Sequence, residues 1–296
     1  MIIPTLFGVT LVVFLLIRLI PGDPARLIAG LQASEEEVAR IRVELGLNRA
    51  LYTQYAIFLS RLVRGDLGNS AVTRTPVVDE IEARLRATVA LATCSIAVAT
   101  LVGTMAGIIS ATRQYSALDY MVMGVALFGV SIPIFWLGLM LMLLFSVHLR
   151  WLPAGGYGTP AHFVLPTIAL AAVSIAIIAR MTRSSLLETF NQDYIRTARA
   201  KGLRGRAVTM RHALKNALIP VITVIGLQFG ALLGGAILTE TVFAWPGLGR
   251  LLVNSVASRD YPVIQGIVVM FAAMFAVVNL VVDLLYAYVD PRIHYG

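Results

Sequence analysis

Six stretches of this chain are each long and apolar enough to cross a lipid bilayer, and they constrain the fold more than any other feature. A membrane-spanning helix needs about 20 mostly apolar residues. The stretches that qualify are residues 2–20, 88–112, 120–147, 163–181, 217–238 and 263–286. With 58% hydrophobic and only 14% charged residues, the composition excludes both an ordinary soluble domain and a disordered chain. We predict an all-α polytopic membrane protein with six transmembrane helices, forming a single transmembrane domain over residues 1–296.

The first apolar stretch is predicted to be an uncleaved helix. No basic residue precedes it, the apolar run is longer than that of a secretion signal, and no small-residue cleavage site follows.

The distribution of charge predicts the orientation in the membrane. Residues 180–216 hold nine of the 24 Lys and Arg residues but only two acids, and so carry seven of the chain's eight net positive charges. A short loop this basic stays in the cytoplasm. With six spans, both termini are then cytoplasmic, and residues 21–87, 149–162 and 239–262 lie outside. Topology explains the excess charge, so no nucleic-acid partner is expected.

The outer segment, residues 21–87, has the pattern of a small folded unit. Ser34 followed by three glutamates is typical of a helix start, and Gly46 is expected to end that helix. A second helix is predicted over residues 51–64, before Gly65. Two interpretations stay open: a cap that contacts an external partner, or a structural lid over the helix ends.

Glycines, a proline and a few polar residues interrupt the predicted spans. Gly226, Gly230 and Gly234 recur every four residues, a pattern that permits close helix packing or forms the wall of a substrate path. Pro133 should kink its helix. Intramembrane polar groups usually turn inward. The candidate pathway residues are Pro133, Gln228, Gly230, Gln265, Asn279 and Asp283.

The chain has one cysteine, Cys94, which excludes an intramolecular disulfide and is expected to be a buried structural thiol. We predict no catalytic residue and no metal site.

The basic loop, residues 184–216, divides at Gly202 into two predicted helices. Tyr194, Thr197, Ala198 and Lys201 recur at helical spacing before Gly202, which can take the left-handed conformation that ends a helix. A second helix should run from about Arg206 into the fifth span, with a bend near Pro220. A short helix followed by a tight turn forms a projecting knob that suits the groove of another protein.

Several motifs together resemble the permeases of ABC importers, and the resemblance covers essentially the whole chain. In the loop they are Thr197-Ala198-Arg199-Ala200-Lys201-Gly202 and Arg211-His212-Ala213-Leu214-Lys215-Asn216-Ala217-Leu218-Ile219-Pro220. Elsewhere they are Pro21-Gly22-Asp23-Pro24, Leu27-Ile28-Ala29-Gly30, Gly65-Asp66-Leu67-Gly68-Asn69-Ser70, Phe243-Ala244-Trp245-Pro246-Gly247-Leu248-Gly249, Arg259-Asp260-Tyr261-Pro262 and the Asn279 to Asp283 ending. The chain is most similar to the peptide/nickel/opine branch, especially glutathione- and dipeptide-import permeases.

The resemblance implies a permease subunit of an inner-membrane importer whose partners are a second permease, two cytoplasmic ATPases and an extracytoplasmic substrate-binding protein. The ATPases would receive the coupling loop, whose contact part is residues 193–212. The residues carried over to this role are Tyr194, Arg196, Thr197, Ala198, Arg199, Lys201, Gly202, Arg211 and His212. The acid of the general Glu-Ala-Ala signature is absent here, where Arg196 stands.

The chain has no Gly-x-x-x-x-Gly-Lys-Ser/Thr phosphate loop, so it should bind no cofactor itself and leave ATP and magnesium to its partners. The cargo stays open among glutathione, dipeptides, longer peptides, a nickel chelate and opines. Two rival classes are a secondary transporter or channel, and a membrane anchor that recruits a cytoplasmic protein. The first predicts corresponding charged pairs or helix breaks in two halves, and no such repeat is evident. The second leaves the glycines and prolines of the spans unexplained.

Overall fold

The computed structural model describes residues 2–19, 25–26, 33–44 and 46–289 of this chain, and these residues are all-helical apart from turns and one isolated bridge between Asn69 and Pro76. The motifs at residues 21–24 and 27–30 and the predicted tail at residues 290–292 lie outside the described residues. The chain divides into two compact units, residues 1–88 with 246–276, and residues 89–245 with 277–296.

The first unit contains α1 (Ile2–Leu19), α3 (Glu35–Glu44), α4 (Leu51–Val63), α12 (Leu248–Ala257) and the N-terminal parts of two long helices, α5 (Val77–Thr112) and α13 (Tyr261–Val289). Phe14 of α1 packs edge-on against Tyr55 of α4, with ring centroids 5.2 Å apart, and stacks on Phe58 at 6.0 Å. A second apolar cluster joins α5, α12 and α13 through Val77, Leu248 and Ile267.

The two helices predicted after the first apolar stretch are confirmed as helices, α3 and α4. The Ser34 hydroxyl accepts the Glu37 backbone N–H at 3.2 Å, as a helix cap does, and Gly46 has a left-handed φ of 67°. The second outer helix is α4. The predicted second span was too short, because α5 begins at Val77 rather than at residue 88. Val77 and Ile81 are buried in the first unit, so the helix extends beyond the apolar stretch.

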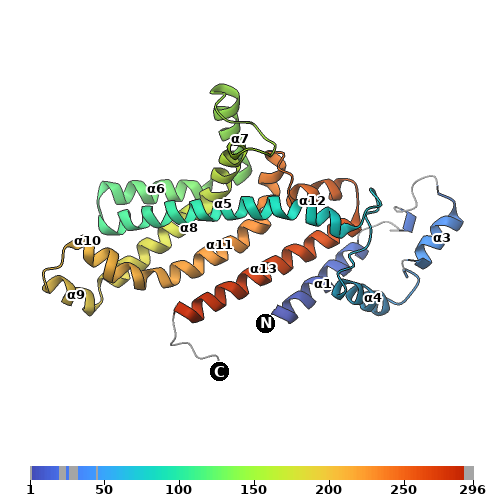
Figure 1. Ribbon diagram of the computed structural model, residues 1–296, viewed down its shortest axis with the longest axis horizontal. Coiled ribbons are helices and arrows are strands. Elements are labelled where there is room, and N and C mark those ends of the chain that lie inside the picture. The colour runs from blue at the N-terminus through green and yellow to red at the C-terminus, as the bar shows by residue number, and fades with distance from the viewer. Residues whose placement is uncertain (1, 20–24, 27–32, 45, 290–296) are drawn as a thin grey trace. The chain divides into compact units, whose positions relative to one another are not determined.

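The second unit consists of the inner part of α5, α6 (Ala117–Ser131), α7 (Ile134–Met142), η1 (Leu143–His148), α8 (Pro160–Phe190), α9 (Asp193–Ala200), α10 (Gly205–Ala207), η2 (Val208–Ala213), α11 (Leu214–Val242) and the end of α13. Helix α8 is central: α6, α7 and α11 all pack along it (Figure 1). Its core face is lined by small and branched side chains such as Ala171 and Ile178, which pack on Ala99 and Val221.

Glycines allow three close helix approaches in the second unit. A Cβ at Gly103 or Gly107 would lie 2.8 Å or 2.6 Å from a backbone carbonyl oxygen of α8, and a Cβ at Gly226 would lie 2.0 Å from Val282 of α13. The packing interpretation therefore holds for Gly226. It does not extend to Gly234, where an added Cβ would meet nothing within 4 Å.

The predicted third span is not one helix. The described residues contain four helices that are long and apolar enough to cross a membrane, or five if α6 and the Ile134–His148 helix, bent by 101°, form one span. Pro133 disfavours a helical conformation at Ile132, whose ψ is 129°, so the chain breaks rather than kinks there. The expectation for Cys94 was wrong: its side chain is exposed, because it lies on a face of α5 that the chain itself does not cover.

Candidate functional site: the α9–α10 projection

The short helix α9 is anchored to the second unit by its apolar face. Ile195 is fully buried and Ala198 is 7% exposed, and both belong to a cluster with Leu186 of α8 and Val208 of η2. These two positions are three residues apart and therefore share one face of the helix. Burying them fixes which way α9 faces.

Two polar contacts hold α9 from its flanks. The Asn216 side-chain amide of α11 donates a 2.7 Å hydrogen bond to the Tyr194 hydroxyl. The Arg199 guanidinium lies 5.6 Å from the ring centroid of Phe190 at the end of α8, within the range of a cation–π contact. Helix α9 is thus tied to both of the long helices that flank the loop.

Gly202 ends α9 as predicted. Its φ is 75°, and its N–H bonds the Arg199 carbonyl oxygen at 2.9 Å. A Cβ at Gly202 would meet nothing within 4 Å, so only the left-handed backbone, not the available space, favours glycine here. Gly205, three residues later, also has open space but no positive φ.

After the turn the chain runs without a break from Gly205 through α10 and η2 into α11, in agreement with the predicted second helix. Helix α11 includes Pro220 in its interior, and residues Val208–Ala213 form a wider π-helical stretch before it. The bend near Pro220 stays a prediction. The Ser185 hydroxyl of α8 also donates a 2.8 Å hydrogen bond to the Ala217 carbonyl oxygen. Any displacement of α9 or α10 is therefore applied directly to α8 and α11.

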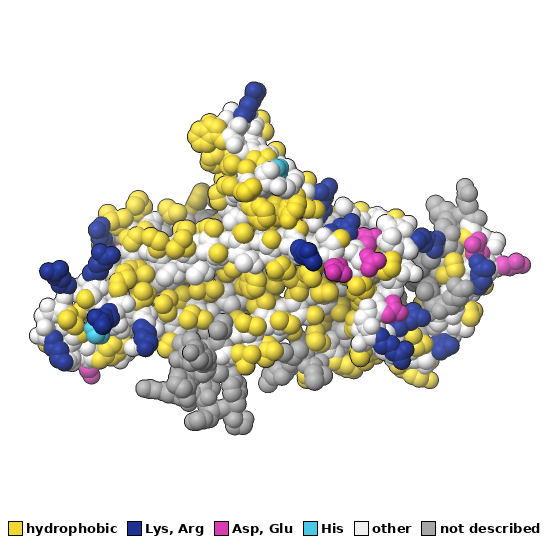
Figure 2. All heavy atoms as spheres, in the orientation of Figure 1, with side chains coloured by type: hydrophobic (Ala, Val, Ile, Leu, Met, Phe, Trp, Pro, Cys, Tyr) yellow, Lys and Arg dark blue, Asp and Glu magenta, His cyan; other side chains and the backbone are white. Residues whose placement is uncertain are grey.

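The exposed surface of this region is basic. Figure 2 shows Lys and Arg side chains gathered where α9 and α10 lie. We call residues 193–207 the α9–α10 projection. Of the predicted coupling residues, the exposed ones are Tyr194, Arg196, Thr197, Arg199, Lys201, Gly202 and Arg211, and His212 is partly exposed. Ala198 is buried in the chain's own core, so of the predicted coupling residues it is the one that is not exposed to a partner.

The candidate pathway residues are divided between the two units. The Gln228 amide of α11 donates a 3.1 Å hydrogen bond to the hydroxyl of Ser174 on α8, inside the second unit. Asp283 is exposed, Asn279 partly exposed and Gly230 buried, and Pro133 is exposed at the helix break. Gln265 belongs to the first unit, where its side-chain nitrogen is buried without a hydrogen-bond partner among the described residues.

A buried ion pair that sequence analysis missed fixes the inner end of the second unit. Asp119, 2% exposed, accepts two hydrogen bonds from Arg183 of α8, at 2.8 Å and 2.7 Å. It also accepts the Tyr115 N–H at 3.0 Å and the Ser110 hydroxyl. The pair locks the α5–α6 turn to α8. The sequence signal was weak: Asp119 stands at a span boundary and Arg183 within a basic run.

A second missed carboxylate organises the outer loop of the first unit. Asp260, 4% exposed, accepts the Ser70 hydroxyl, the Ala71 N–H at 3.1 Å and the Val72 N–H at 3.4 Å. Ser70 lies 190 positions before Asp260 in the sequence. Asp260 had been singled out only as part of a family motif.

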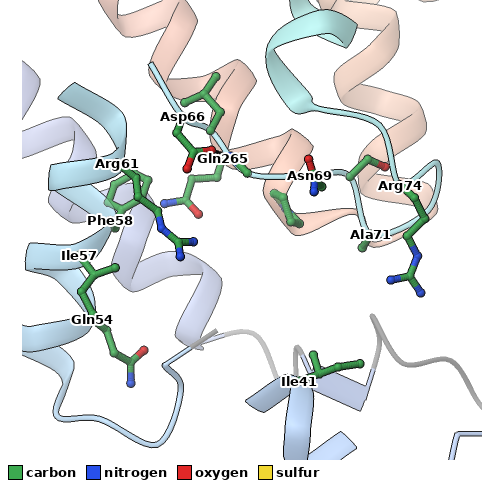
Figure 3. A pocket seen from close by; sticks show the side chains of 14 residues that line it. Ile41, Gln54, Ile57, Phe58, Arg61, Asp66, Asn69, Ala71, Arg74 and Gln265 are labelled. Carbon is green, nitrogen blue, oxygen red and sulfur yellow. Dashed lines mark hydrogen bonds between the residues drawn. The ribbon is translucent and has the colours of Figure 1, made fainter. Parts of the chain in front are cut away.

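That loop borders a pocket of about 540 Å³ in the first unit. Figure 3 shows Gln54, Phe58 and Arg61 of α4 on one side, and Asp66, Asn69 and Arg74 of the loop on the other. Gln265 also lines it. The pocket is lined by both polar and apolar side chains and lies in the part of the chain predicted to be external.

Comparison with known proteins places the chain in a family. The family described as "Binding-protein-dependent transport system inner membrane component" matches residues 103–295, and the corresponding N-terminal family matches residues 1–92. The dipeptide transport system permease protein DppB of Alkalihalophilus pseudofirmus is 47% identical, over 100% of this chain and 97% of its own length. The glutathione transport system permease protein GsiC of Escherichia coli K12 is 48% identical, over 99% and 96%.

Solved structures agree on the fold. A chain of the MetNI methionine ABC transporter, in an inward-facing conformation, superposes with a TM-score of 0.63 over 71% of this chain and 96% of its own, at 18% identity. A chain of an amino acid ABC transporter gives 0.56 over 78% and 98%, at 16% identity. The fold is that of an ABC-transporter permease, a multi-pass membrane protein. This chain belongs to the family of binding-protein-dependent transport system inner membrane components, as a permease subunit of an ABC importer.

Proposed function

We propose that the chain forms half of the translocation pathway of an ATP-driven importer for small peptides, and that its α9–α10 projection couples the pathway to cytoplasmic ATPases. The importer would contain a homologous second permease, two ATPases and an extracytoplasmic binding protein. The chain would span the membrane six times with both termini in the cytoplasm. The names of the dipeptide and glutathione relatives support a peptide cargo.

The observation that carries the coupling proposal is the anchoring of α9. A helix held by buried Ile195 and Ala198 on one face offers its opposite, basic face to a partner while staying fixed to α8 and α11. When ATP draws the ATPase partners together, a groove that holds α9 moves it, and the movement reaches both long helices. Alternation between inward-open and outward-open states follows from tilting those helices.

ATP and magnesium would be bound by the partners rather than by this chain, which supplies mechanical coupling and no catalytic group. Within the described residues there is no group of three or more His, Cys, Asp or Glu side chains with the arrangement of a metal site. Because its sequence has no Gly-x-x-x-x-Gly-Lys-Ser/Thr phosphate loop, we expect the permease chain to hydrolyse no ATP when purified alone.

The outer segment would receive the binding protein. The pocket between α4 and the Asp66–Arg74 loop offers two arginines, and the loop is held firmly by Asp260. Arg61→Ala should weaken the stimulation of ATPase activity by the binding protein while the complex still assembles, because Arg61 is an exposed side chain of α4. Unchanged stimulation of ATPase activity would show that the pocket is not part of the surface that binds the binding protein.

The coupling test compares two glycines of the same loop. Gly202→Val forces a β-branched residue into a left-handed backbone at φ 75°, whereas Gly205→Val meets open space without a positive φ. In reconstituted vesicles we expect Gly202→Val to hydrolyse ATP with little peptide uptake, and Gly205→Val to keep the two linked. Full uptake by Gly202→Val would refute the coupling role.

A further inference from the structure

A pocket of about 780 Å³ lies in the second unit beside α9. Its lining includes Arg199, which also belongs to the predicted coupling residues. Its walls come from the end of α5, the end of α8, and the α9–α10 projection with the start of η2. The turn after α5 that borders it follows a helix apolar enough to cross the membrane.

The polar side of this pocket is strongly basic. Arg113, Arg199 and Arg206, from three different elements, all line it. None of the described residues that line it is an Asp or a Glu, and no ion pair is found for these three arginines within the described part of the chain. Among the described residues, Arg199 makes a cation–π contact with the Phe190 ring, which leaves its charge unneutralised. Three unneutralised guanidinium groups on one pocket favour an anion, and phosphate in particular.

The floor of the same pocket is apolar. Ile108, Leu187, Phe190 and Val208 line it and belong to, or pack against, the cluster that anchors α9. Met210, 46% exposed, stands at its edge. If the pocket bound an inorganic anion or an acidic side chain, its apolar floor would stay exposed to water. A ligand with a phosphate head and a hydrocarbon chain satisfies both sides.

We propose that this pocket binds an anionic phospholipid of the inner leaflet, with its phosphate among Arg113, Arg199 and Arg206 and an acyl chain along the apolar floor. Basic pockets between transmembrane helices at the cytoplasmic surface are suited to such headgroups. The inference rests on the proposed function only for the orientation of this end toward the cytoplasm. The bound lipid would act as a wedge between the α5–α6 turn and the projection, and so stiffen the coupling element.

The test counts lipid on the whole complex, purified with its permease and ATPase partners and stripped of loosely bound lipid. Native mass spectrometry would compare added phosphatidylglycerol, phosphatidylcholine and inorganic phosphate. The variant is Arg113→Gln with Arg206→Gln, and the matched control is Arg204→Gln, an exposed arginine of the same loop that does not line the pocket.

We expect phosphatidylglycerol to be retained by the wild type and by Arg204→Gln. The double variant should bind it about twenty-five-fold more weakly, since each basic group near a membrane surface contributes about fivefold. Equal retention by all three proteins, equal affinity for phosphatidylcholine, or equal affinity for inorganic phosphate would each overturn the proposal. So would release of the ATPases with lipid retention unchanged, which would assign the pocket to a protein interface. Lipid retention is measured without measuring peptide uptake. The lipid proposal can therefore be refuted while the coupling proposal still stands, and the reverse.

Discussion

The α9–α10 projection and the outer loop at residues 66–76 are both exposed segments, yet they are held in opposite ways. The projection is fixed by buried apolar side chains, Ile195 and Ala198, and adds polar contacts only at its flanks. The outer loop is fixed by the buried carboxylate of Asp260, which gathers a hydroxyl and two backbone N–H groups. Apolar anchoring is non-directional and tolerates small shifts, whereas carboxylate anchoring prescribes one loop conformation.

The difference fits the work proposed for each segment. A coupling helix has to stay attached while it is pushed, and apolar packing keeps its energy when side chains slide slightly. A docking loop has to present the same shape to each arriving partner, and directional hydrogen bonds enforce that shape. Each of the following experiments breaks or sharpens this comparison, starting with the largest expected effect.

Ile195→Ala should loosen the projection most. The side chain is fully buried, and truncating a buried isoleucine costs about 3 kcal/mol. We expect faster hydrogen exchange at the backbone amides of α9, measured by mass spectrometry on the intact complex, with the outer loop unaffected. Leu203→Ala is the control, because Leu203 is 42% exposed. Equal exchange in both variants would mean that α9 does not depend on its apolar face.

Asp260→Ala should release the outer loop. It leaves the partly buried N–H donors of Ala71 and Val72 and the Ser70 hydroxyl without their shared acceptor, at a cost of about 2 kcal/mol. Limited proteolysis should then cut between residues 66 and 76, while the projection keeps its protection. Asp66→Ala is the matched acidic control, because Asp66 is exposed and bonds only the nearby Gly68 N–H. Resistance of the Asp260 variant to cleavage would contradict carboxylate anchoring.

Ser70→Ala should have the smallest effect, about 1 kcal/mol, because the Asp260 carboxylate keeps its backbone donors. A double-mutant cycle sharpens the comparison. Combining Ser70→Ala with Asp260→Ala should cost less than the sum of the two, since the residues share one network, whereas Ser70→Ala with Ile195→Ala should be additive. Additivity of the first pair would show that Ser70 and Asp260 act separately.

The same contrast explains what the sequence could predict. The helices α3, α4 and α9 were predicted closely because helical spacing and capping residues are local in the sequence. The turn at Gly202 was predicted because glycine adopts the left-handed conformation at little energetic cost. The family also followed from motifs that stand in order along the chain. The six-span count and the cytoplasmic coupling contacts stay predictions.

Long-range polar pairs could not be predicted in this way. Asp260 meets Ser70, and Asp119 meets Arg183, across sequence distances that no local pattern spans. The face of Cys94 was predicted wrongly for a related reason: an apolar helix in a membrane protein shows no polar stripe to mark which side the rest of the chain covers. The break at Pro133 was underestimated because a proline's effect depends on whether neighbouring helices hold the two halves in line.

The most direct test of the central claim is a crosslink from α9 to its proposed partner. In a Cys94→Ser background, Lys201→Cys would carry a short photoactivatable group on the exposed end of α9, with Val43→Cys, 62% exposed on the outer segment, as control. Illumination of the assembled importer in membranes should join the Lys201 variant to an ATPase subunit and leave the Val43 variant free of it. A Lys201 variant that crosslinks only to the binding protein, or to no ATPase in an assembled complex, would contradict coupling through this projection.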